Sequence, residues 1–122
     1  MLNISGLTDL ERDVLLEILA AHPDPDSVLQ DQFEHARIVS REMSGVGFFL
    51  KLATDSTRAF PADGEFTGTC ADIPGLEHPV MFALFIREGR IDWLEGWTVV
   101  EPWPEVTSGY RLYRIASATK LH

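Results

Sequence analysis

The chain has 122 residues, of which 45% are hydrophobic and 24% charged, a composition typical of one folded domain and not of a disordered chain. Its 19 acidic residues outweigh its 10 Lys and Arg residues, which gives a net charge of -9. This balance argues against nucleic acid or an anionic membrane as the main partner, because both bind cationic surfaces.

The first expected element is a helix that begins after Thr8. Thr8 and Glu11 have the spacing of a capping box, in which each side chain bonds the other residue's backbone amide. An apolar stripe with four-residue spacing follows, formed by Leu10, Val14 and Ile18. Pro23 ends the helix, because proline cannot continue it.

A second short helix is expected directly afterwards. Asp24 is placed to cap it, and Pro25 suits its first position. Its apolar face is formed by Leu29, Phe33 and Ala36. We expect it to end near residues 35–37, which makes residues 7–36 a helical pair.

After residue 36 the apolar period changes from 3.6 to 2, which predicts strands. The expected strands are residues 37–43, 46–53, 65–73, 80–86, 91–99 and 110–116. Residues 80–86 are apolar at every position, so we expect a central strand buried on both faces. Glu88 and Gly89 suit a two-residue hairpin turn. Residues 101–105 contain two prolines and predict a rigid, extended connector.

This order of elements predicts an α+β fold. Two N-terminal helices would pack on one face of a curved antiparallel sheet of five or six strands, because short connections favour antiparallel neighbours. The domain would span residues 1–122, with the helical pair at 7–36 and the sheet at 37–116.

Two segments of the chain carry a resemblance to a known family. They are residues 39–49, which read VSREMSGVGFF, and residues 84–104, which read LFIREGRIDWLEGWTVVEPWP, with a Gly-Leu-Glu-His stretch at residues 75–78. These segments resemble a family of small, uncharacterised bacterial cytosolic proteins. The resemblance implies a self-contained cytosolic domain and carries no reaction or site residue with it.

The compartment and the ligand chemistry follow from residue types. The single cysteine, Cys70, permits no intramolecular disulfide and is typical of a reducing compartment. Residues 1–6 lack a signal-peptide pattern, and no apolar run approaches the ~20 residues of a membrane helix, so we expect a cytoplasmic protein. The four histidines, His22, His35, His78 and His122, show no metal-ligand spacing. We therefore expect no metal or other cofactor, and we interpret Cys70 as a small buried hydrophobe.

Glu95 is the best candidate for acid–base chemistry. It lies between Trp93 and Trp97 on one strand face, where the indoles would partly desolvate its carboxylate, as a general acid requires. Asp92 would point to the opposite face, so a second group would have to come from Glu42, Asp72 or Glu101. The alternative is a structural Glu95 that bonds a backbone turn or pairs with Arg41.

The tryptophans carry the main functional hypothesis. The aromatic group Trp93, Trp97, Trp103, Tyr110 and Tyr113 either forms core or leaves an apolar patch beside Pro102 and Pro104. We interpret the chain as a non-enzymatic protein-interaction domain, immunity-like or self-associating as a homodimer, whose acidic surround would attract a basic partner. The candidate binding residues are Trp97, Trp103, Glu95, Glu101 and Arg41. The alternative is a small ligand-binding module or enzyme with Glu95 in a tryptophan-lined pocket.

Overall fold

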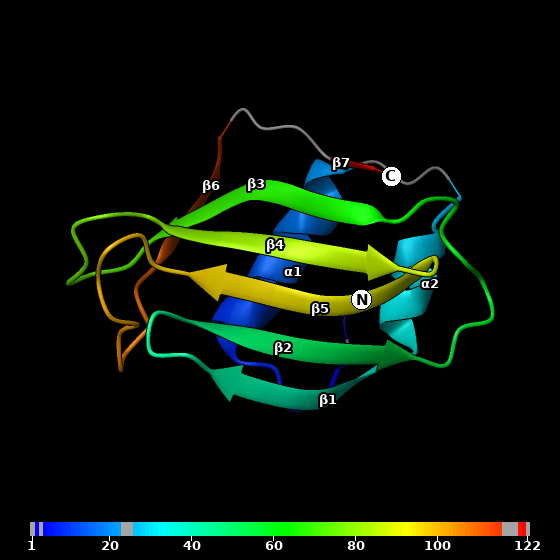
Figure 1. Cartoon of the computed structure of the whole chain (residues 1–122), viewed down its shortest axis with the longest axis horizontal. Helices are drawn as coiled ribbons and strands as arrows, with labels where there is room; N and C mark the ends of the chain where they lie inside the picture. The colour runs from blue at the N-terminus through cyan, green and yellow to red at the C-terminus, as the bar shows by residue number, and fades with distance from the viewer. Residues whose placement is uncertain (1, 3, 23–25, 116–119, 122) are drawn as a thin grey trace.

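The structure is a computed structural model, and it describes residues 2, 4–22, 26–115 and 120–121. Two helices pack on one face of an antiparallel sheet (Figure 1). The helices are α1 (Asp9–Ala21) and α2 (Val28–Glu34). The strands are β1 (Ala36–Met43), β2 (Gly47–Thr54), β3 (Gly64–Asp72), β4 (Val80–Arg87), β5 (Arg90–Trp97), β6 (Arg111–Arg114) and β7 (Lys120–Leu121). The predicted α+β fold is confirmed.

The sheet has the strand order β1-β2-β5-β4-β3-β6, and every pairing is antiparallel. The short β7, which the sequence did not predict, pairs with β3. β4 lies between β5 and β3, so its predicted interior position is confirmed. The connection from β2 to β3 passes the end of the sheet near α2 (Figure 1). β2 and β3 are therefore consecutive in sequence but are not neighbours in the sheet.

The first helix begins as predicted. The Glu11 amide donates to Thr8 Oγ1 at 3.1 Å, and the Thr8 amide donates to Glu11 Oε1 at 2.9 Å. The buried stripe of α1 consists of Leu10, Val14, Leu15 and Ile18. Its packing against β3 and β4 covers the middle of one sheet face.

The second helix begins later than predicted. Its N-cap is Ser27, in the left-handed region with φ 55° and without a capping hydrogen bond from its side chain. The predicted cap, Asp24, and the predicted first helical residue, Pro25, lie outside the described residues. Ala36 belongs to β1 and not to the helix, because α2 ends at Glu34 and the chain there enters the sheet.

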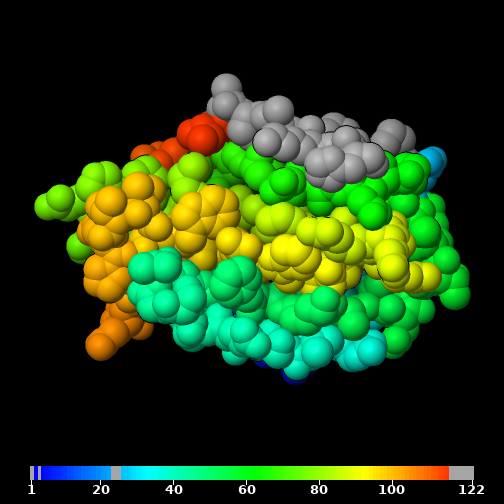
Figure 2. Space-filling model, viewed as in Figure 1, coloured from blue at the N-terminus to red at the C-terminus, as the bar shows by residue number. Residues whose placement is uncertain are grey.

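One prediction about β4 is wrong. Its helix-facing side chains, Val80, Phe82, Leu84 and Ile86, are almost completely buried. On the other face Met81 and Phe85 are only partly buried. No helix covers this face of the sheet, as Figure 2 shows. The uninterrupted apolar run therefore marks one buried face and one partly exposed apolar face.

The β4–β5 hairpin contains the predicted turn and an unpredicted bulge. Glu88 and Gly89 have φ 54° and 74°, as a two-residue turn of the primed type requires. The register then shifts between the Phe85–Trp93 and Ile86–Ile91 pairs. This extra residue brings Asp92 to an ion pair with Lys51, so the expectation that Asp92 points away from the Trp93 face is wrong.

Candidate functional site

The sheet side that faces away from α1 and α2 is the candidate site, and we call it the open face (Figures 1 and 2). Strand alternation assigns side chains to it, because their sequence neighbours are buried on the helix side. Its central residues are Phe49, Lys51, Met81, Phe85, Trp93, Glu95 and Trp97. Four aromatic rings thus lie on an uncovered sheet face, with Phe49 exposed and the other three partly buried.

Trp93 is held in place by neighbours on the open face. Its ring stacks on Phe85, with the centroids 4.1 Å apart and the planes 14° apart. The Arg87 guanidinium lies 5.2 Å from the ring centroid, a cation–π distance. The indole Nε1 donates to Glu95 Oε1 at 3.2 Å. Trp93 is therefore a fixed part of the surface, because its ring and its N–H group already have partners.

Trp97 lies at the other end of β5, among different neighbours from those of Trp93. Its register neighbours are Gly47 on β2 and Met81 on β4, so no second ring stands directly opposite it. Within residues 26–115, no described ring contact or side-chain hydrogen bond engages its indole. Phe49, diagonally across β2, has 41% of its surface exposed. A partner could therefore contact the exposed Phe49 ring together with the half-buried Trp97 indole beside it.

Three exposed valines lie in the loops that adjoin this end of the sheet. Val46, Val99 and Val100 are 53%, 58% and 73% exposed. The two loops that carry them lie side by side, because the amide of Thr98 donates to the Val46 carbonyl at 2.8 Å and the Thr98 hydroxyl donates to it at 3.0 Å. We call the set Phe49, Trp97, Val46, Val99 and Val100 the apolar end of the open face.

Of the five predicted binding residues, only Glu95 and Trp97 share the open face. Trp103 packs edge-on against Phe48 on the core side, with the centroids 5.2 Å apart. Glu101 accepts the amides of Glu77 and His78, each at 2.9 Å, and these hydrogen bonds hold its pKa below the usual range. The Glu101 carboxylate thus links the loop around residue 101 to the loop at residues 77–78.

Arg41, the fifth predicted residue, belongs to the helix side of the sheet. Its guanidinium donates to both carboxylate oxygens of Glu11, at 2.8 and 2.5 Å. Arg41 therefore anchors the start of α1 and does not reach Glu95. The prediction overlooked Phe49, although an aromatic residue at a solvent-side position of an alternating strand was a signal for it.

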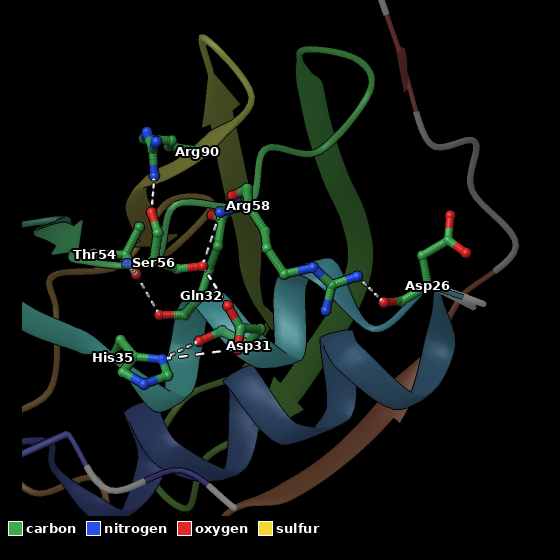
Figure 3. Close-up of polar contacts among 8 residues, drawn as sticks. All are labelled: Asp26, Asp31, Gln32, His35, Thr54, Ser56, Arg58 and Arg90. Carbon is green, nitrogen blue, oxygen red and sulfur yellow. Dashed lines mark hydrogen bonds and ion pairs between the residues drawn. The ribbon is translucent and has the colours of Figure 1, made fainter.

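A polar cluster near α2 is satisfied within the chain (Figure 3). The Gln32 side chain donates to the carbonyls of Arg58 and Gly89 and accepts the amide of Ile91. Around it, Thr54 donates to the Gln32 carbonyl and Ser56 to Asp31. These bonds join α2, the loop after β2 and the β4–β5 turn, so we assign this cluster a structural role.

An apolar cavity of about 320 Å³ lies beside α1 and α2, lined by residues such as Leu16, Leu19 and Phe33, on the side of the sheet opposite Glu95. In the described ranges, no group of three or more metal-binding side chains comes together. The helices that the structure describes include none with the length and hydrophobicity needed to cross a membrane.

Comparison of the chain with protein-family models, with curated proteins and with solved structures finds no match.

Proposed function

We propose that this protein is a non-enzymatic docking domain that binds another protein through the apolar end of the open face. The observation that carries the proposal is the diagonal pair Phe49 and Trp97 on the uncovered face, at an end of the sheet whose adjoining loops carry three exposed valines. Aromatic residues are enriched at protein interfaces, and a contiguous apolar surface rimmed by charge is typical of them. Burial of this surface by a partner would supply the binding energy.

The surroundings of Glu95 favour docking over catalysis. Its register neighbours are Phe49 and Ala83, neither of which ionises. The hydrogen bond to its carboxylate comes from an indole N–H group. Acid–base catalysis on this face would need a second titratable group close to Glu95, and the residues directly opposite it do not provide one.

A different protein is a better occupant of this face than a second copy. Each copy carries a net charge of -9, so two copies would repel each other. We propose further that the domain acts in the bacterial cytosol, as the resemblance of residues 39–49 and 84–104 implies. Cys70 is a free, buried cysteine, which is typical of a reducing compartment.

Affinity capture with matched variants tests the proposal. Trp97→Ser and Phe49→Ser alter the apolar end of the open face, while Leu16→Ser alters a leucine on α1 that is as exposed as Phe49, on the other side of the molecule. We expect one protein from the source cells to be retained by the wild type and by Leu16→Ser and to be lost with both face variants. Equal retention by all four proteins, or no retention by the wild type, would contradict the proposal.

A further inference from the structure

We propose that the partner presents a basic segment to the open face, with an arginine side chain that lies over Phe49 and pairs with Glu42 and Glu95. This inference rests on the proposed docking function and names the chemistry of the partner. It starts from one row of residues that crosses three neighbouring strands.

The row is fixed by strand register. Glu42 of β1 lies directly opposite Phe49 of β2, and Phe49 lies directly opposite Glu95 of β5. Residues directly opposite each other in antiparallel strands point to the same face, with Cβ atoms about 5 Å apart. A carboxylate therefore stands on each side of the exposed Phe49 ring, and the two are separated by about two strand spacings, or roughly 10 Å.

These two carboxylates have no cationic partner among the residues that the structure describes. The cations nearest in the sheet are already engaged elsewhere. Lys51 pairs with Asp92, Arg41 pairs with Glu11, and Arg87 lies over Trp93. Among the described residues, the negative charge of the row is thus not balanced by an ion pair, in contrast to that of Asp72 and Asp92 on the same sheet.

An aromatic ring between two unbalanced carboxylates matches the chemistry of an arginine. The guanidinium can stack on the Phe49 ring while it donates hydrogen bonds to carboxylate oxygens. It is more weakly hydrated than an ammonium group, so its transfer to an interface costs less than that of lysine. Its aliphatic stem would cover the neighbouring Trp97 indole. The net charge of -9 would also attract a basic partner over a distance.

Selection of peptides from a random phage-displayed library of twelve-residue peptides tests this inference. The baits are the wild type, the double variant Glu42→Gln and Glu95→Gln, and Trp97→Ser. The glutamine at position 95 keeps an oxygen that can accept the Trp93 N–H group, so Trp93 stays anchored. The matched control is Asp26→Asn with Glu88→Gln, which removes two exposed negative charges outside the row.

We expect the wild type and the charge control to enrich peptides that combine arginine with apolar residues. The double glutamine variant should lose the arginine enrichment, and a selected peptide should bind it about fivefold more weakly than the wild type. Apolar enrichment without arginine, or arginine enrichment unchanged in the glutamine variant, would overturn the inference and leave docking in place. If the wild type enriches no peptide that Trp97→Ser fails to enrich, the docking function itself is overturned.

Discussion

The buried side chain of Gln32 on α2 accepts the backbone amide of Ile91 on β5 at 2.8 Å. Its nitrogen donates to the carbonyls of Gly89 and Arg58, at 2.8 and 2.9 Å. The register shift of β5 begins at Ile91, so one glutamine satisfies backbone groups at the bulge and in the loop that follows β2. This contact between a helix and a hairpin holds one end of the sheet in place.

Gln32→Leu is therefore expected to destabilise the fold strongly. The substitution keeps the volume but leaves the Ile91 amide and the Arg58 carbonyl without their partner, at a cost of about 2–4 kcal/mol in unfolding free energy. Urea denaturation measures the change. Gln30→Leu, at an exposed position of the same helix, is the control. Equal stability of the two variants would show that the Gln32 hydrogen bonds contribute little.

The Arg41–Glu11 ion pair is expected to contribute more than the Arg37–Asp55 pair. Glu11 is almost fully buried, so Arg41→Met would leave a buried carboxylate without its cation and cost about 2 kcal/mol. Arg37 and Asp55 are both mostly exposed, and Arg37→Met should change the unfolding free energy by less than about 0.5 kcal/mol. Chemical denaturation of both variants checks the order, and a reversed order would count against it.

Phe85→Ala is expected to be milder than Phe82→Ala, although both residues lie on β4. Phe82 is almost completely buried, and its removal should cost about 3–5 kcal/mol through the cavity that it leaves. Phe85 lies on the open face, where it mainly supports Trp93. A double-mutant cycle of Phe85→Ala and Trp93→Ala should give a coupling of about 0.5–1.5 kcal/mol for the stacked rings. A coupling of zero would mean that the stacking does not stabilise the sheet.

The contact of Tyr110 with Asp13 predicts a pH dependence at high pH. The Tyr110 hydroxyl donates to the Asp13 carboxylate, and burial together with this bond raises the pKa of Tyr110 to about 12. The folded state therefore holds the proton more tightly than the unfolded state, whose pKa is about 10. The resulting stability is complete below pH 10 and disappears as the pH rises toward 12.

Tyr110→Phe is the matching variant for this test. The difference in unfolding free energy between the wild type and Tyr110→Phe should be constant below about pH 10 and then shrink as the pH approaches 12. Subtraction of the variant removes the contribution of other titrating groups, Tyr113 included. A difference that stays constant up to about pH 11.5 would show that Tyr110 titrates alike in both states.

Short-range patterns in the sequence determined the secondary structure well. The capping box at Thr8 and the turn at Glu88 and Gly89 could be predicted because each depends on residues within a few positions of one another. The change of apolar period near residue 36 likewise placed the transition from helix to sheet correctly. These features together were enough for the α+β class.

The functional surface depended on contacts between distant parts of the chain. The row of Glu42, Phe49 and Glu95 exists because β5 lies beside β2, and no local pattern encodes that neighbour. A bulge also adds one residue to β5, which reverses the face on which Asp92 was predicted, since side chains alternate with a period of two. Local residue patterns were therefore sufficient to locate both helices and six of the seven strands. The order of the strands depends on pairing between distant segments, and this order sets which aromatic rings and carboxylates share an uncovered face.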